Sequence, residues 1–502
     1  MERESHVDAL VIGGGLAGLT CAVGLVGEGM EVILVERDAM LGGRSRSWID
    51  PVTGDPVHVG PHIFLDEYPN MWRLLETIGS DGHISWQPDG LFVTMVKGRE
   101  RTEMRDAGWP PPYHFVPSLL QASNVRLRDL VSNWPVTSLA MRLDEDGVKR
   151  LDEESALAFL RRMGVSESFI DWYWRFTALA IMNVPLEVCS AGALLRFYKF
   201  QVGHAGIRVG FANTGLGDVF APQARATIEA GKGQVWLETG VRRILAEGDS
   251  ATGVELADGR KVHARYVVAA TTPMALREIL PRPWVDRHRV FADLVHFHPV
   301  PYISVYLWFD RRLTDLTFWA RSYDPNDLNT DFYDLRNLYD GGSGDGGSLI
   351  ATNIIWCHRA AALDDEQVVA ETVRELSEFL PEAAEAKVVH QVVSRIPMAI
   401  HAPFPGTERN RPSPRTPVHG LVLAGDWVQT GFPSSMESAV RSGWLAAEAV
   451  LEDRTSLALE HRPAHGLAGM YERLPAAATA YGPAVALRML GRAHRRLRHR
   501  PE

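Results

Sequence analysis

The sequence predicts an α/β fold in which a Rossmann-type domain, built from both ends of the chain, encloses an inserted mixed α+β domain. An apolar strand at residues 8–12 runs into a glycine turn, a helix and a second strand that ends at Glu36, which is the order of a βαβ unit. Near the other end, the apolar segment 420–427 leads into a helical pattern from about Ser434 to Glu452. The long middle of the chain mixes both periodicities, as an inserted domain would.

The sequence pattern between residues 68 and 215 also predicts helices. Residues 68–79 predict a short helix, with Pro69 in its first turn and Gly79 as its end. From about 80 to 215 the pattern has helical periodicity and many aromatic residues, so we expect a helical insertion there.

Strand patterns return in the second half. They cover residues 233–271, which contain a hairpin turn, and residues 302–310. The glycine-rich segment 339–348 follows no buried strand and opens no helix. It therefore predicts a hairpin loop rather than a phosphate-binding loop.

The composition narrows the classes of function. The chain has 502 residues, 46% of them hydrophobic, which is enough for two packed domains. Its net charge of -10 argues against a nucleic-acid partner, because phosphate binding needs a positive field. Cys21, Cys189 and Cys357 are far apart, so we expect no disulfide framework and no metal site. The charged start "MERESH" and the lack of an uninterrupted apolar run favour a cytoplasmic protein without a signal peptide.

The glycine turn has the spacing of a dinucleotide-binding motif. Gly13, Gly15 and Gly18 form G-x-G-x-x-G between a strand and a helix, and Glu36 closes the next strand. The glycines allow a tight turn and let a diphosphate approach the helix N-terminus, while the acid can accept hydrogen bonds from the ribose. The motif alone does not distinguish NAD from FAD, and a turn without a ligand is the alternative.

Two further motifs resemble those of the flavin amine oxidase superfamily. The segment "LGGRSRS" at 41–47 matches its GGR signature, in which the arginine, here Arg44, binds the FAD diphosphate. "AGDW" followed by "SSMESAV" resembles its second flavin motif, in which Asp426 holds the ribityl chain and a helix N-terminus faces the flavin. Ser434 and Glu437 have capping-box spacing, which would fix that N-terminus. Three motifs in this order predict FAD as the cofactor.

The same resemblance implies the remaining cofactor contacts. Val241 falls where the superfamily's strand contacts the adenine end, and residues 60–63 fall where the chain passes beside the isoalloxazine ring. No cysteine lies in the C-terminal flavin motif, so noncovalent FAD is expected, and no second dinucleotide motif suggests a nicotinamide partner. The expected cofactor-binding residues are Gly13, Gly15, Leu16, Ala17, Gly18, Glu36, Arg37, Gly43, Arg44, Gly60, Pro61, His62, Ile63, Val241, Gly425, Asp426, Ser435, Met436 and Ala439.

The segment "GPHIFLDEYPN" at 60–70 indicates the branch of the superfamily. It resembles a stretch of phytoene and zeta-carotene desaturases, and the C-terminal flavin motif is similar both to these and to squalene-associated hydroxysqualene dehydroxylases. The resemblance implies an FAD-dependent oxidoreductase that acts on a long isoprenoid as a carotenoid desaturase, with hydroxysqualene dehydroxylase as the close alternative.

Two other functions compete with this hypothesis. Flavin amine oxidases place a lysine on the strand before the active site, where this chain has Ser304, which disfavours amine oxidation. Rab GDP-dissociation inhibitors have a similar architecture and bind prenyl groups without catalysis. Arg44, Glu36 and Asp426 argue against such a carrier, since a protein without a flavin has no use for them.

Desaturation implies hydride transfer from an allylic carbon to flavin N5 and loss of a proton from the neighbouring carbon. His62 is the candidate catalytic proton carrier that the motifs place near the ring, and Tyr68 is a second candidate. A quinone or oxygen would reoxidise the flavin. The aromatic segments 172–182 and 302–310 are candidate tunnel walls, although such residues are often ordinary core.

We expect two domains and a tail. The FAD-binding domain would comprise residues 6–85, 215–275 and 412–455, the substrate domain residues 86–214 and 276–411, and the helical tail residues 456–502. The discontinuous first domain follows from the two distant flavin motifs.

The tail and one proline-rich segment predict contact with a membrane surface. Residues 484–500 carry six arginines, no acid and leucines at near-helical spacing, which is typical of a basic amphipathic helix. A solvated tail is the alternative. The segment 109–122 presents aromatic and apolar residues among prolines and is a second candidate contact.

Overall fold

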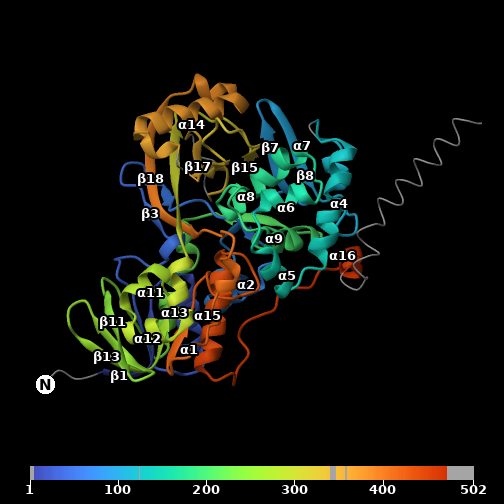
Figure 1. Cartoon of the computed structure of the whole chain (residues 1–502). Helices are drawn as coiled ribbons and strands as arrows, with labels where there is room; N and C mark the ends of the chain where they lie inside the picture. The colour runs from blue at the N-terminus through green and yellow to red at the C-terminus, as the bar shows by residue number, and fades with distance from the viewer. Residues whose placement is uncertain (1–4, 124, 340–345, 357–358, 472–502) are drawn as a thin grey trace, which may run out of the picture.

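The computed structural model describes residues 5–123, 125–339, 346–356 and 359–471, which form two lobes (Figure 1). The lower lobe in Figure 1 contains the first large sheet, whose strands come from segments near both ends of the described chain. The upper lobe contains the second large sheet. Within the described ranges, we find no helix long and apolar enough to cross a membrane. The predicted α/β class is confirmed.

A seven-stranded sheet forms the lower lobe. Its strands are, in spatial order, β10 (Gly233–Trp236), β2 (Val32–Val35), β1 (Ser5–Ile12), β13 (Lys261–Ala269), β12 (Ser250–Leu256) and β11 (Val241–Glu247), and β19 (Leu421–Leu423) also pairs with β13. Strands β10, β2, β1, β13 and β19 pair in parallel, whereas β11 and β12 are antiparallel. Parallel pairing of strands from both chain ends is what a Rossmann-type domain of two distant segments requires.

Helices from opposite ends of the chain pack against each other on this sheet. α1 (Leu16–Gly27) follows β1, and α15 (Met436–Val450) follows β19. They approach closely at Gly443, where an added Cβ would lie 2.5 Å from the Ala17 carbonyl oxygen. This contact fixes the two flavin motifs relative to each other.

Two more helices pack beside this pair. They are α2 (Pro69–Ile78), which packs on α15, and α10 (Ala221–Ala230), which packs on α1. α2 confirms the predicted helix at 68–79, and it ends at Gly79 with a left-handed φ of +70°.

A second seven-stranded sheet lies in the upper lobe. Its strands, in spatial order, are β18 (Val388–His401), β14 (Pro299–Phe309), β17 (Leu349–Ile355), β16 (Asp331–Asp334), β15 (Phe318–Arg321), β7 (Leu91–Lys97) and β8 (Glu100–Arg105). Neighbours are antiparallel except for β15 and β7. One face packs on α14 (Asp365–Phe379) through an apolar cluster that includes Ile303, Phe332 and Leu376. The other face is free to line a site.

Helices of the upper lobe lie on the side of the sheet away from α14. They are α3 (Val116–Leu119), α4 (Leu127–Met141), α5 (Glu145–Leu151), α6 (Ala156–Arg162), α7 (Glu167–Phe169), α8 (Arg175–Met182) and α9 (Ala191–Gly203), with a π-helical turn at Ile170–Trp174 before α8. The helical insertion that we expect over 80–215 is thus present from residue 116 onwards.

The expectation of helix is wrong at both ends of that range. It begins with β6 (Ile84–Trp86), β7 and β8, and it ends with β9 (Val209–Ala212), which pairs with β6 and with β5 (Phe64–Leu65). β7 is apolar almost throughout because both of its faces are covered, so it lacks the alternation that identifies a strand.

The remaining elements are short. α11 (Pro273–Ile279), α12 (Arg282–Arg287) and α13 (Arg289–Ala292) lie on the lower lobe (Figure 1). α16 (Gly466–Tyr471) packs on α4 and α9, and β3 (Ser47–Ile49) pairs with β4 (Pro56–His58). The glycine-rich segment predicted as a loop falls mostly at 340–345, and the basic segment at 484–500, so both lie outside the described residues. The ranges of the two domains stay a prediction.

Candidate functional site

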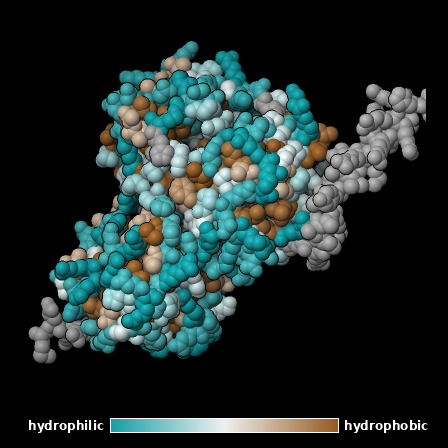
Figure 2. All heavy atoms as spheres, viewed as in Figure 1, coloured by the Kyte–Doolittle hydropathy of each residue, from teal (hydrophilic) through white to brown (hydrophobic). Residues whose placement is uncertain are grey.

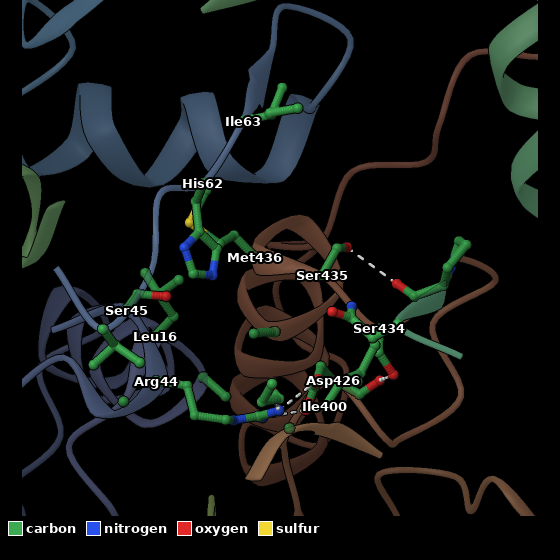
Figure 3. Close-up of a pocket in the computed structure, with 18 of the residues that line it drawn as sticks. Leu16, Arg44, Ser45, His62, Ile63, Ile400, Asp426, Ser434, Ser435 and Met436 are labelled. Carbon is green, nitrogen blue, oxygen red and sulfur yellow. Dashed lines mark hydrogen bonds and ion pairs between the residues drawn. The ribbon is translucent and has the colours of Figure 1, made fainter. Parts of the chain in front are cut away.

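One elongated cavity of about 520 Å³ runs from the glycine turn of the lower lobe to the second sheet of the upper lobe. One end is lined by the turn between β1 and α1, the end of β2 and the start of β11. The middle is lined by the first turn of α15 and by Arg44, His62 and Asp426, which Figure 3 shows together. The far end is lined by β7, β8 and β14 to β18 on one side and by α8 and α9 on the other.

Most of the predicted site residues line this cavity. They are Gly13, Gly15, Leu16, Ala17, Glu36, Arg37, Arg44, Pro61, His62, Ile63, Tyr68, Val241, Gly425, Asp426, Ser435, Met436 and Ala439. Gly18, Gly43 and Gly60 lie behind the lining and act through close packing. A Cβ on Gly18 would collide with the Gly13 carbonyl oxygen, and one on Gly60 would collide with the Tyr302 hydroxyl.

The glycine turn leaves a helix N-terminus open to the cavity. Gly13 has a left-handed φ of +107°, and a Cβ there would lie 2.6 Å from the Ala270 carbonyl oxygen. Gly15 is the N-cap of α1 and has no side-chain hydrogen bond to the first turn. Beyond its chain neighbours, the nearest atom to a Cβ on Gly15 would be the Gly43 Cα at 4.0 Å. Free N–H groups beside open space fit a diphosphate.

Glu36 stabilises this turn as well as lining the cavity. Its carboxylate accepts hydrogen bonds from the Gly14 N–H at 2.7 Å and from the Asp38 N–H at 2.9 Å. Arg37, predicted as a cofactor contact, is largely exposed, with its Nε 3.8 Å from Asp38. The geometry therefore gives Glu36 a fixed orientation and leaves Arg37 free to turn.

Arg44 and Asp426, from motifs 382 residues apart, meet in the middle of the cavity (Figure 3). The two Arg44 guanidinium nitrogens donate to the two carboxylate oxygens of Asp426 at 3.0 and 2.5 Å. His401 adds a third contact, with its Nε2 3.4 Å from the same carboxylate. Burial by itself would raise the pKa of Asp426, but the charge of Arg44 and the contact with His401 outweigh it, so the pKa is lowered. Asp426 is therefore an anion in this site.

The first turn of α15 faces the cavity, but its cap differs from the predicted one. Ser435, not Ser434, is the N-cap, and its hydroxyl accepts from the Ser438 N–H at 3.1 Å. Ser434 instead donates to the Asp426 carbonyl oxygen. The predicted capping box is wrong because the helix starts one residue later than that spacing assumes.

Glu437 has a different role from the predicted one. It is fully buried and accepts hydrogen bonds from the backbone N–H groups of Asn70 and Met71, at 3.2 and 2.8 Å. It thereby caps the first turn of α2, whose own N-cap residue, Tyr68, makes no side-chain cap. This contact ties the segment 60–70 to the C-terminal flavin motif.

His62 presents one ring nitrogen to the cavity beside Met436 (Figure 3). Its Nδ1 lies 2.7 Å from the Gly60 carbonyl oxygen, which can only accept, so Nδ1 carries the proton and Nε2 has the free lone pair. Burial lowers the pKa of His62 more than the hydrogen bond to Gly60 raises it, and the charge of Arg44 lowers it further. A neutral imidazole can accept a proton.

Tyr68 also lines the cavity and is 8% exposed. Burial, and then the charge of Glu437, raise its pKa, so the phenol stays protonated. Its ring packs against Phe200 and Phe432, with ring centres at 6.3 and 5.8 Å. It can donate a hydrogen bond or pack against a ligand, but it is a poor base.

The far part of the cavity is mainly apolar. Its lining includes Phe92, Val93, Met104, Phe176, Ala180, Ile181, Phe197, Phe318 and Ile355. Of the two aromatic segments predicted as walls, 172–182 contributes five residues, among them Tyr173, and 302–310 contributes Tyr302. Ser304, at the position compared with the amine oxidase lysine, is fully buried outside the lining.

Four polar residues of the far part are not predicted from the sequence: Asp331, Tyr333 and Asn353 of the sheet, and Gln201 of α9. The short strand "DFYD" gave no motif, and only the register of β16 and β17 turns these side chains to the cavity.

A sequence profile of flavin-containing amine oxidoreductases matches residues 16–451. A 15-cis-phytoene desaturase from Solanum lycopersicum is 26% identical over 462 residues, which cover 89% of this chain and 78% of that protein. A 15-cis-phytoene desaturase from Synechococcus elongatus is 25% identical over 460 residues, covering 89% of this chain and 96% of that protein. A probable zeta-carotene desaturase of the same organism is 26% identical over 479 residues, covering 88% and 98%.

Solved structures share the fold at lower sequence identity. Putrescine oxidase bound to putrescine superimposes with a TM-score of 0.69 at 16% identity, covering 89% of this chain and 99% of that chain. Cyclohexylamine oxidase from Brevibacterium oxydans has a TM-score of 0.66 at 19% identity, with the same coverage of both chains. These likenesses show the fold of the two lobes.

Proposed function

Because the chain belongs to the family of flavin-containing amine oxidoreductases, we propose that it binds FAD noncovalently and oxidises a long isoprenoid, as a carotenoid-type desaturase. One observation carries the proposal. A single cavity joins an open helix N-terminus, suited to a diphosphate, to a chamber lined mainly by aromatic and aliphatic side chains. The similarity to phytoene and zeta-carotene desaturases supports a hydrophobic polyene substrate.

The residues present fit FAD along the first half of the cavity. The N-terminus of α1 would hold the diphosphate, Glu36 the ribose and Val241 the adenine end. Arg44 and Asp426 would hold the diphosphate and the ribityl chain, and the N-terminus of α15 would face the ring. When bound, the flavin supplies an acceptor for a hydride from the substrate. Among the described residues of the lining there is no cysteine, in agreement with a noncovalent cofactor.

The chain itself contributes positioning and a proton acceptor. The apolar walls exclude water and hold a flexible chain in one orientation, which favours reaction more than a strong base would. His62 Nε2 is the acceptor that we assign to the proton lost from the substrate. Tyr68, which lines the same cavity, would pack against the substrate or donate a hydrogen bond to it.

An amine substrate fits this chamber less well. The solved relatives include enzymes named for amines, but their identity of 16–19% supports the fold alone. No lysine occurs in the described lining, and Ser304 lies outside it. The chamber walls are mainly aromatic and aliphatic, so a charged ammonium would lose its hydration there. Their one carboxyl group, Asp331, has its pKa raised to about 7 by burial, so it offers no fixed full charge to pair with an ammonium.

A membrane surface would supply such a substrate. Most of the surface seen in Figure 2 is hydrophilic, with apolar patches on the upper lobe. Trp109, Leu120, Leu127, Leu467 and Met470 are exposed around the proline-rich segment and α16. Those two parts are joined by the Ala468 N–H, which donates to the Pro111 carbonyl oxygen at 2.8 Å. We include peripheral membrane contact in the proposal, with a quinone or oxygen as the final electron acceptor.

Anaerobic titration of the purified holoprotein tests the proposal. We expect a yellow protein with an absorption band near ~450 nm, as bound oxidised flavins show. Phytoene in detergent or liposomes should bleach this band, whereas putrescine and cyclohexylamine should not. The variant His62→Gln should keep the flavin and lose about 100-fold or more in the rate of bleaching.

Two results would contradict the proposal. A colourless protein that cannot be reconstituted with FAD would favour a non-catalytic prenyl carrier. Bleaching by an amine alone would return the chain to the amine oxidases.

A further inference from the structure

The sheet wall of the substrate chamber carries one cluster of polar side chains among its apolar side chains. Strands β7, β8, β15 and β18 contribute Phe92, Val93, Met104, Phe318 and Ile400 to the lining. Between them, β16 contributes Asp331 and Tyr333, and β17 contributes Asn353. Apart from Glu36, Asp38 and Asp426 in the cofactor half and Glu278 of α11, Asp331 is the one acidic side chain of the described lining.

Asp331 is held by neutral partners. The Tyr333 hydroxyl donates to one carboxyl oxygen and the Asn353 side-chain amide to the other, both at 3.2 Å. No described residue forms an ion pair with Asp331, which is 5% exposed. The Asn353 amide oxygen is buried and has no hydrogen-bond partner among the described residues. One carboxyl group and one unpaired acceptor therefore lie together on the chamber wall.

Burying these polar groups lowers the stability of the folded protein, and a wall that only contacts hydrocarbon could be built from apolar side chains without this cost. Asp426, on the same cavity, has Arg44 as a partner, but Asp331 has no such compensation. Burial raises the pKa of Asp331 to about 7, against the lowering effect of its hydrogen bonds from Tyr333 and Asn353. The group therefore offers both a donor and an acceptor near neutral pH.

We propose that Asp331 and Asn353 form a subsite that binds a hydroxyl group on the isoprenoid filling the chamber. An alcohol matches this wall, since its hydroxyl can donate to the Asn353 oxygen or the carboxylate and can accept from the protonated acid. This inference rests on the proposed function, because it takes an isoprenoid as the occupant. It makes an oxygenated isoprenoid, rather than a pure hydrocarbon, the preferred ligand.

The subsite lies toward the cofactor half of the cavity. β16 is separated from β14 by β17 alone. On β14, Tyr302 packs beneath Gly60, and its hydroxyl donates to the Val59 carbonyl oxygen at 2.8 Å. Gly60 opens the segment that we expect beside the flavin ring. The hydroxyl would thus be placed near the reacting end of the substrate, not at its distant tail.

Binding of matched ligand pairs to the oxidised holoprotein tests the subsite without turnover. The pairs are squalene with a monohydroxylated squalene, and lycopene with a monohydroxylated lycopene, each in liposomes. Perturbation of the flavin spectrum and quenching of tryptophan fluorescence report binding. In the unaltered protein we expect each alcohol to bind about 10-fold more tightly than its hydrocarbon.

Variants separate recognition from a purely structural role. Asp331→Leu should invert the preference, with the hydrocarbon binding at least as tightly as before, whereas Asp331→Asn should retain part of the preference for the alcohol. Ser304→Ala, buried on β14 outside the lining, should behave like the unaltered protein. Flavin content and melting temperature verify that each variant is folded.

Two results overturn the subsite. They are equal binding of alcohol and hydrocarbon by the unaltered protein, and a preference that survives in Asp331→Leu. Either would mean that Asp331 only joins β16 to β17. A yellow protein that binds neither member of any pair would instead contradict the proposed function, and the subsite with it.

Discussion

In the cofactor part of the cavity a carboxylate, Asp426, is paired with Arg44, while on the wall of the substrate part Asp331 is held by two neutral side chains. Both carboxyl groups are buried, yet their pKa values move in opposite directions, below the ordinary value for Asp426 and up to about 7 for Asp331. The cofactor end therefore keeps a fixed charge, and the substrate end keeps a group that can give or take a proton. The pairing, not the residue type, decides the chemistry of each end.

The largest expected effect is at the cofactor end. Gly15→Val would project a side chain into the open space beside the α1 N-terminus, where no atom beyond the chain neighbours lies closer than 4.0 Å to a Cβ. The backbone φ of -80° at Gly15 suits any residue, so the fold should survive. We expect FAD to bind about 1000-fold more weakly, or about 4 kcal/mol, in equilibrium dialysis. Gly27→Val, at the other end of α1, should bind FAD normally, and equal binding by both variants would contradict the cradle.

The next effect concerns the charged pair. Arg44→Met would leave Asp426 as a buried carboxylate without its main partner. We expect the flavin-free protein to lose about 3 to 5 kcal/mol in its free energy of unfolding in urea. Arg46→Met removes an exposed ion pair with Asp38 and should cost less than about 1 kcal/mol. Losses of equal size would show that the pair in the cavity is no stronger than a surface one.

The raised pKa of Asp331 should make the free energy of unfolding depend on pH. Because the pKa of Asp331 is raised to about 7, the folded protein holds a proton that the unfolded chain releases above its ordinary pKa near 4. Its contribution to stability therefore falls as the pH rises through this window. Asp331→Asn should remove the fall, so its advantage over the unaltered protein should grow by about 2 to 3 kcal/mol from pH 5 to pH 7.

Urea unfolding at a series of pH values measures this difference. Asp81→Asn, at an exposed position after α2, is the control and should follow the unaltered protein. A constant difference between Asp331→Asn and the unaltered protein would mean that Asp331 is ionised throughout.

The smallest effect concerns the outer surface of the upper lobe. Trp109→Ser together with Met470→Ser removes two exposed apolar side chains, each worth on the order of 1 kcal/mol of membrane burial. We expect about 10-fold weaker pelleting with anionic liposomes and unchanged FAD binding. Val52→Ser, exposed in the turn between β3 and β4, should pellet normally. If the double variant and Val52→Ser pellet alike, this face is not the membrane contact.

The two ends also differ in how much the sequence could predict. The glycine turn, Glu36, Arg44 and Asp426 occur in short local motifs, and the structure brings them to one cavity. α15 starts one residue later than the sequence predicts. Ser434 and Ser435 are both suitable N-cap residues, and only the backbone conformation shows that Ser435 is the N-cap. The sequence therefore predicts which residues form the cofactor motifs, but it does not predict the exact residue at which α15 begins.

The substrate end could not be read in this way. Asp331 and Asn353 lie on strands that meet only through sheet pairing, and their neighbours alternate between the α14 face and the cavity face. β7 was mistaken for helix because both of its faces are apolar. Which side a strand residue faces depends on register across distant segments, and no single-sequence pattern contains that information.

A crystal structure of the holoprotein with an isoprenoid alcohol tests the central claim most directly. We expect density for FAD from the α1 N-terminus to the first turn of α15, and for an extended chain between β15 and α8 with its hydroxyl at Asp331. A ring that is absent, or one whose face opens onto a small hydrated pocket instead of this chamber, would contradict the account.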